Sequence, residues 1–191
     1  MFRPLLAGAA CLALLTACND RGASPAVDKA QDMAAAPVGQ TSAATIGANT
    51  IDGYVPAAAM GDMYEIQAAT IALRRSTNAS VRELATMIRT DHTAASNMFK
   101  APASADAPNV ALPTALDQRR QGLIDNLTSA SDADFDRVFL DQQIAAHNEA
   151  RTLHRGFSDN ADAPGLAGHA RTAAPRIEAH LRMAEQIKAA M

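Results

Sequence analysis

The fold is decided by residues 80–99, which read SVRELATMIRTDHTAASNMF. Ser80 and Glu83 form an S-x-x-E capping box, which is typical of a helix start. Apolar residues then recur at steps of three and four, the period of a helix with one buried face: Val81, Leu84, Ile88, Ala95 and Phe99. This stretch therefore predicts a long helix packed against others.

One histidine lies on the same buried face. His92 follows Ile88 by four residues and precedes Ala95 by three. Helical spacing therefore predicts that its imidazole points inward, between helices.

The composition favours a helical protein with one core. The chain has 191 residues, of which 48% are hydrophobic and 19% charged, while aromatic residues make up 4% and Trp is absent. Close-packed helices suit this composition better than sheets, which favour β-branched and aromatic residues. The formal net charge of −3 argues against nucleic acid as a partner, because no basic face is evident.

Residues 1–17 are expected to be a lipoprotein signal peptide. Arg3 gives a short basic start, and the apolar run 5–17 is too short to span a bilayer as a stable helix. The run ends in LTAC at 15–18, which resembles the lipobox of bacterial lipoproteins, with Cys18 as the acylated residue. An ordinary signal peptide or a structural cysteine is the alternative. We expect a palmitate-bearing protein on the periplasmic side of the cell envelope, at the outer membrane rather than the inner one.

The remaining N-terminal segment is predicted to be a tether. Cys11 lies in the signal peptide, so no thiol remains for a disulfide or a cysteine-ligated metal once Cys18 carries lipid. Residues 18–50 are rich in Ala, Gly, Ser and Thr without a sustained apolar period, which indicates a flexible linker. Packing of this segment on the domain is less favoured. Residues 51–191 are expected to form the bundle domain.

The apolar periodicity predicts further helices on both sides of residues 80–99. One runs over 52–76 with Pro56 in its first turn, and a loop spans 101–112. A shorter helix begins at Pro113 and ends near 127. A long helix follows a capping box at 131–134 and ends near 157, and the last is capped by Asp162.

Two long helical hairpins joined by a connection with a short helix predict an all-α, ferritin-like four-helix bundle with one long crossover. Four short motifs occur in order along these helices: Asp91-His92, Asp134-Phe135-Asp136, His147, and Pro175 followed by His180-Leu181. In these motifs the chain resembles the bacterial "domain of unknown function 4142" family, which is assigned this fold and is commonly secreted or lipid-anchored. The resemblance covers about residues 52–187 and implies a fold and a compartment, but no reaction.

The sequence argues against a standard di-iron site. Such sites need Glu-x-x-His on two helices, because residues three apart share a helix face. Here the acids near the histidines are Asp91 beside His92 and Glu178 two before His180. Those spacings rotate the acid away from the imidazole by about 100° and 200°.

Two interpretations of the inward histidines remain open. The favoured one is a structural polar core of Asp91, His92, His147 and His180, in which His92 and His180 are partners. The other is a metal site for Fe, Zn or Cu, with ligands from four helices: Glu65, His92, His147 and His180. His169 is expected to be exposed.

These interpretations give three hypotheses of function. The leading one is a lipid-anchored, periplasm-facing bundle with a structural, stress-related or interaction role among envelope proteins, without enzymatic activity. The second is a metal-binding or redox protein that uses the interior histidines and Glu65. The third, binding of a small apolar ligand between helices, has no specific residue in its support.

Overall fold

The computed structural model describes residues 29–32, 34, 39, 43 and 50–191. In that part of the chain helices are joined by turns, and no strand occurs. The helices are α2 (Ile51–Arg75), α3 (Ala79–Asp106), α4 (Gln118–Ser129), α5 (Phe135–Phe157) and α6 (Pro164–Ala189).

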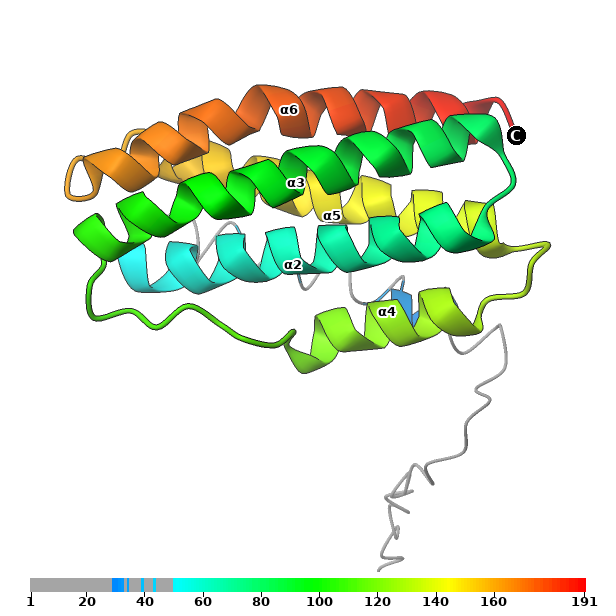
Figure 1. Ribbon diagram of the computed structural model, residues 1–191, viewed down its shortest axis with the longest axis horizontal. Coiled ribbons are helices and arrows are strands. Elements are labelled where there is room, and N and C mark those ends of the chain that lie inside the picture. The colour runs from blue at the N-terminus through cyan, green and yellow to red at the C-terminus, as the bar shows by residue number, and fades with distance from the viewer. Residues whose placement is uncertain (1–28, 33, 35–38, 40–42, 44–49) are drawn as a thin grey trace, which may run out of the picture.

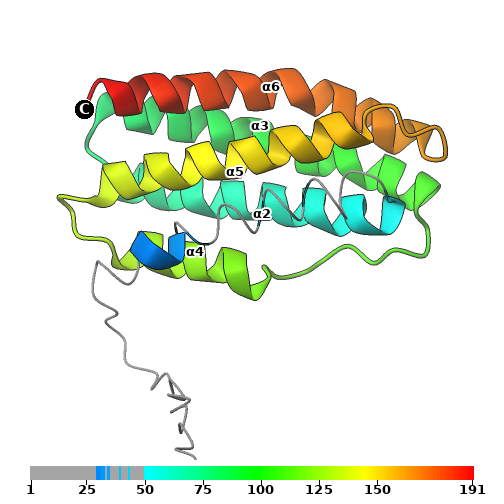
Figure 2. The same ribbon diagram turned by 180° about the vertical axis from the view of Figure 1, so that it is seen from behind.

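The four long helices form a bundle in which α2 and α3 make one hairpin and α5 and α6 the other (Figure 1). The connection from α3 to α5 runs the length of the bundle and contains α4, so α3 and α5 point in the same direction (Figure 1). Figure 2 shows α4 running alongside α2, on the side of the bundle where α5 also lies. The predicted all-α, ferritin-like four-helix bundle with a short extra helix in the crossover is confirmed.

The apolar core is divided into two clusters along the bundle. One contains Leu84, Ile88, Phe139 and Leu140, and the other contains Tyr54, Val55, Phe99, Phe157 and Leu166. Between them, each long helix contributes a buried polar residue: Glu65, His92, His147 and His180. A polar layer therefore crosses the middle of an otherwise apolar interior.

The helix starts differ in detail from the sequence predictions. α3 is capped by Asn78, whose side chain accepts hydrogen bonds from the backbone of Ser80 and Val81. The cap predicted at Ser80 is therefore two residues too late. α4 begins at Gln118 rather than Pro113, because the Asp117 carboxylate accepts from the Arg120 backbone at 2.7 Å. A side-chain acceptor at the cap thus sets each start.

Two prolines lie deeper in helices than predicted. Pro56 is in the second turn of α2 rather than the first, since Thr50 is the cap. Pro102 lies inside α3, which continues to Asp106 where a loop was predicted. Burial of Ala103 against the second apolar cluster offsets the backbone hydrogen bond that Pro102 cannot donate.

The start of α6 is capped from another helix. Pro164 is at its first position, and Asp162, which was predicted to cap this helix, makes no cap hydrogen bond. Instead the Asp106 carboxylate at the end of α3 accepts from the Leu166 backbone at 2.8 Å. The extension of α3 past Pro102 therefore joins the ends of α3 and α6.

Part of the segment predicted to be a tether contacts the bundle. Asp32 accepts hydrogen bonds at 2.8 Å from the amides of Asn126 and Gln142, and so joins α4 to α5. Ala43 is buried in the second apolar cluster. Cys18 and the predicted signal peptide lie outside the described residues.

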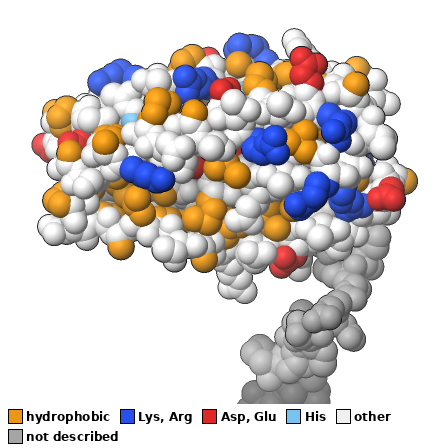
Figure 3. All heavy atoms as spheres, viewed as in Figure 1, with side chains coloured by type: hydrophobic (Ala, Val, Ile, Leu, Met, Phe, Trp, Pro, Cys, Tyr) orange, Lys and Arg blue, Asp and Glu red, His pale blue; other side chains and the backbone are white. Residues whose placement is uncertain are grey.

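The surface seen in the direction of Figure 1 has no continuous basic patch. Figure 3 shows Lys and Arg side chains standing apart over much of this face, with apolar side chains between them. Among the helices that the structure describes, none combines the length and apolar character needed to cross a bilayer.

A buried histidine in the second apolar cluster predicts loss of stability in acid. His154 Nδ1 forms a 2.9 Å hydrogen bond with the Tyr54 hydroxyl, and burial, with the charges of His169 and His92, lowers its pKa from 6.5 to about 3. Between these two pKa values His154 is protonated in the unfolded chain and neutral in the folded chain. Its contribution to the free energy of unfolding is therefore complete above pH 6.5 and decreases as the pH drops toward 3. Between pH 6.5 and 4.5 this costs about 2 kcal/mol.

Urea denaturation at several pH values checks this. The H154Q variant is expected to lose about 2 kcal/mol less than the parent over the same interval. Equal acid sensitivity in the two proteins would show that His154 is not responsible.

Candidate metal centre

Three histidines from three helices meet in the polar layer. His92 of α3, His147 of α5 and His180 of α6 each offer one ring nitrogen, and the three nitrogens lie within 4.8 Å of one another. All three rings are buried, with exposed fractions of 7%, 1% and 1%. We call them the histidine triad.

The orientation of His147 is set within its own helix. Its Nδ1 lies 2.9 Å from the carbonyl oxygen of Gln143, one turn earlier. A carbonyl can only accept, so Nδ1 carries the proton and Nε2 of the neutral ring is a lone pair. That Nε2 lies 3.1 Å from Nδ1 of His180.

The other two rings are held by carboxylates. His180 Nε2 lies 2.9 Å from Asp91 Oδ2, and His92 Nδ1 lies 2.8 Å from Asp62 Oδ1. Each imidazole thus has an acceptor on its outer nitrogen: a carbonyl for His147 and a carboxylate for the others. Metal-binding histidines in proteins almost always have such a partner, which fixes the tautomer and the ring orientation.

The three hydrogen bonds in this arrangement require either a third proton or a cation. The chain from the Gln143 carbonyl through His147 and His180 to Asp91 has three hydrogen bonds, while two neutral imidazoles carry two protons. Burial lowers the pKa of His147 far below its usual value, and it lowers the pKa of His180 despite Asp91, so the third proton is disfavoured. A metal ion between the facing nitrogens would replace that proton and bind both lone pairs.

Near the triad, His92 Nε2, Glu65 Oε2 and both side-chain amide atoms of Gln143 have no hydrogen-bond partner in the described part of the chain. Native proteins rarely leave buried polar atoms unpaired, so each needs an explanation. Asp62 holds the His92 ring through its other nitrogen, Nδ1. Coordination of a metal ion would explain why His92 Nε2 has no protein partner.

Glu65 lies next to the triad but not within it. Its Oε1 is 3.5 Å from His147 Nδ1, the nitrogen that faces Gln143 rather than His180. Burial raises the pKa of Glu65 to about 7 against the opposing effect of His92. Burial also lowers the pKa of His92, but the hydrogen bond to Asp62 and the charge of Glu65 outweigh it, so the net shift is upward.

The sequence-predicted residues are thus brought together with two differences. Of the predicted ligand set Glu65, His92, His147 and His180, only the histidines form the group. His180 hydrogen-bonds His147 and Asp91 rather than the predicted partner His92, whose ring centroid is 5.5 Å away. Asp91 joins the layer, but through His180 and not through its sequence neighbour.

Two supporting residues, Asp62 and Gln143, were not among the predicted site residues. Asp62 lies on the buried face of α2, so the apolar periodicity of that helix could have indicated that its side chain points inward. Gln143 acts through its backbone carbonyl, which no side-chain pattern reveals. His169, predicted to be exposed, is partly buried, with its ring centroid 4.9 Å from that of Phe99.

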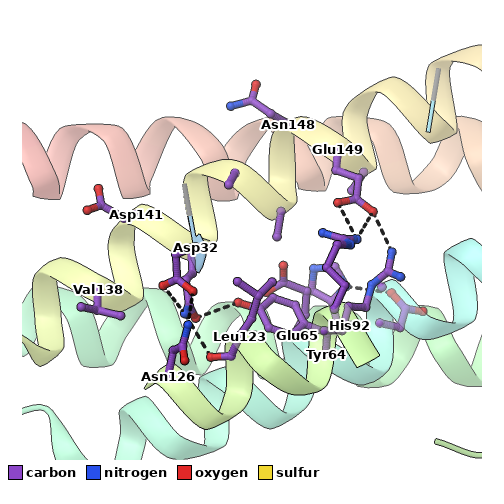
Figure 4. Close-up of a pocket in the computed structure, with 18 of the residues that line it drawn as sticks. Asp32, Tyr64, Glu65, His92, Leu123, Asn126, Val138, Asp141, Asn148 and Glu149 are labelled. Carbon is purple, nitrogen blue, oxygen red and sulfur yellow. Dashed lines mark hydrogen bonds and ion pairs between the residues drawn. The ribbon is translucent and has the colours of Figure 1, made fainter. Parts of the chain in front are cut away.

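A cavity of about 1030 Å³ lies beside the triad. It is lined by residues of α2, α4 and α5, and His92 reaches it from α3. Figure 4 shows Glu65 and His92 at this cavity with Tyr64 and Leu123. His147 and His180 are not among its described lining residues.

The contact between His147 and His180 predicts coupled effects on stability. With a chelator present, His147→Leu and His180→Leu are each expected to cost about 1–3 kcal/mol, because each leaves one buried ring nitrogen of the other histidine without a partner. The double variant should cost less than the sum by at least about 0.5 kcal/mol. Urea denaturation of the four proteins measures this coupling.

A control double-mutant cycle combines His180→Leu with His169→Ala, because His169 lies about 16 Å from His180 along the same helix. That pair should be additive within about 0.5 kcal/mol. Additivity of the His147 and His180 pair as well would contradict the contact.

Comparison with known proteins adds a family but no activity. No curated protein and no solved structure matches the chain. Residues 36–187 match the family described as "Domain of unknown function (DUF4142)". This match begins before α2, ends within the last turn of α6 and includes every residue of the histidine triad. The chain belongs to the DUF4142 family.

Proposed function

We propose that this protein binds one divalent transition-metal ion at the histidine triad. The observation that carries the proposal is the pairing of the three rings. Each outer nitrogen faces a carbonyl or carboxylate, and the three inner nitrogens lie close together, those of His147 and His180 at 3.1 Å. A purely structural polar core would be expected to pair those inner atoms as well, yet His92 Nε2 has no partner among the described residues.

The distances suit a tetrahedral ion. Zinc–nitrogen bonds of about 2.0–2.1 Å place two ligands of a tetrahedron about 3.4 Å apart. The two facing nitrogens of His147 and His180 are already 3.1 Å apart, so His92 is the ring that would move closer. Three neutral imidazoles suit Zn, Cu, Fe or Ni, and the absence of thiolate from the triad argues against a purely soft-metal site.

Zinc is the ion we favour. Three histidines with one remaining position are a common catalytic zinc arrangement, whereas structural zinc sites are usually closed by four protein ligands. Copper binds nitrogen sites more tightly in vitro, so a titration alone does not identify the native ion.

Elemental analysis of the protein, purified without an affinity metal or a chelator, tests this proposal. We expect about one zinc per chain, released at acid pH as the histidines are protonated. Protein that contains no transition metal, stays folded and takes up none on titration would contradict the proposal. The triad would then be the structural polar core that the sequence analysis favoured.

We also propose that this metal centre is held at the periplasmic face of the outer membrane by a lipid on Cys18. The LTAC sequence at residues 15–18 supports this. A role among envelope protein partners is compatible with it. Replacing Cys18 with Ser should move the protein from the membrane fraction to the soluble fraction, and unchanged fractionation would argue against the anchor.

A further inference from the structure

A cavity borders one side of the triad. Asp62, Glu65 and His92 line the cavity, whereas His147 and His180 do not. An ion bound by three imidazoles in a tetrahedron keeps a fourth position. Because His92 lines the cavity and His147 and His180 do not, an open fourth position would face the cavity.

The cavity wall next to this position is largely apolar. Small and apolar side chains from three helices line it: Ala57, Ala58, Gly61, Leu123, Val138, Ala145, Ala146 and Leu153. Its volume of about 1030 Å³ is at the upper end of the range for small-molecule sites. A ligand that fills it is therefore expected to have an apolar body.

Three arginines at the cavity are already paired with carboxylates. Glu149 accepts hydrogen bonds from both Arg119 and Arg120, and Arg137 is paired with Asp134. These side chains are not available to neutralise a charged ligand without breaking an existing pair. Arg151, whose printed hydrogen-bond partner is the neutral Asn148, and Lys29 also line the cavity, and the ion would be the positive charge at the triad itself.

We propose that the cavity binds a monocarboxylate with an apolar tail, one of whose carboxylate oxygens fills the fourth position of the ion. The inference rests on the proposed function, since the ion supplies the charge. Binding is a ligand exchange in which the carboxylate replaces a metal-bound water. No bond of the ligand breaks and no electron is transferred.

Cobalt substitution gives a test with a visible signal, because the absorption of tetrahedral Co²⁺ changes with its ligands. The probes are acetate, butyrate and hexanoate added to the Co²⁺-loaded protein. If the tail lies in the apolar cavity, each methylene should tighten binding about three- to fourfold. Hexanoate should then bind about 10²-fold more tightly than acetate.

Two glycine substitutions distinguish an effect on the cavity from an effect on the metal ion. A Cβ at Gly61 or at Gly122 meets no atom within 4 Å, and both residues are helical, so G61L and G122L are matched in backbone terms. Gly61 lines the cavity and Gly122 does not. We expect G61L to keep the Co²⁺ spectrum but weaken hexanoate binding at least tenfold, and G122L to change neither.

The outcomes distinguish the two proposals. A protein without the Co²⁺ absorption before any carboxylate is added would contradict the metal centre, and the ligand proposal with it. A normal Co²⁺ spectrum that none of the three carboxylates alters would overturn the ligand proposal alone, as when Glu65 closes the fourth position. Equal affinity for acetate and hexanoate, or equal weakening by G61L and G122L, would also overturn it.

Discussion

Replacing His147 with Ala is expected to abolish stoichiometric metal binding. His147 Nε2 and His180 Nδ1 are the closest pair of facing nitrogens in the triad, at 3.1 Å, so removal of His147 leaves two imidazoles that no longer enclose an ion. Loss of a supporting residue alone typically costs 10–100-fold in metal affinity, and loss of a ligand should cost more than about 10²-fold. Competition with a chromophoric chelator measures this.

The matched control is His154→Gln. His154 is also buried and lies on the same helix two turns later, but it hydrogen-bonds Tyr54 and is not part of the triad. This variant should bind metal as the parent does. If His147→Ala fails to fold, Asp62→Asn and Asp91→Asn provide a second test, each with an expected 10–100-fold loss of affinity. Unchanged affinity in all of these variants would contradict the site.

Replacing Glu149 with Ala is expected to cost about 3 kcal/mol of stability. The Glu149 carboxylate accepts from Arg119 at 2.8 and 2.9 Å and from Arg120 at 2.7 Å, and so joins α5 to α4 (Figure 4). Arg120 is buried, and removing one partner of a buried ion pair leaves a charge uncompensated, typically at about 3–5 kcal/mol. The remaining pair with Asp117 places the expectation at the lower end.

Urea denaturation measures this effect, and thermal unfolding should show a midpoint about 10 °C lower. The control is Asp132→Ala, which removes an ion pair between Arg75 and an almost fully exposed carboxylate. It should cost less than about 1 kcal/mol, because exposed pairs contribute little. Similar costs in the two variants would show that α4 is not held by Glu149.

The helices and their pairing were predictable from apolar spacing. α2 and α5 begin and end within a few residues of the predicted bounds, because long amphipathic helices repeat the same signal over many turns. The short connections between α2 and α3 and between α5 and α6 then required each pair to form an antiparallel hairpin. The inward position of His92 followed from the same periodicity.

Features decided by tertiary contacts were not predictable. Proline at 102 indicates a helix end locally, yet α3 continues because Ala103 is buried and Asp106 caps α6. In the predicted tether, Asp32 meets Asn126 and Gln142 far along the sequence. No local pattern encodes such contacts.

The site was predictable in its residues but not in its pairing. Periodicity places a side chain on a helix face, but the rotation and height of neighbouring helices decide which atoms meet. Asp91 therefore reaches His180 across the bundle rather than its neighbour His92, and Asp62 takes the position beside His92. Glu65 was predicted as a ligand, but its carboxylate faces the outer nitrogen of His147.

The most direct test of the metal centre is an anomalous difference map from crystals of the zinc-loaded protein, recorded at the zinc edge. We predict one strong peak in the middle of the bundle, about 2.0–2.1 Å from one nitrogen each of His92, His147 and His180. It should vanish in crystals of His147→Ala. A peak bound elsewhere on the chain, or none at the triad in crystals that contain zinc, would contradict the account.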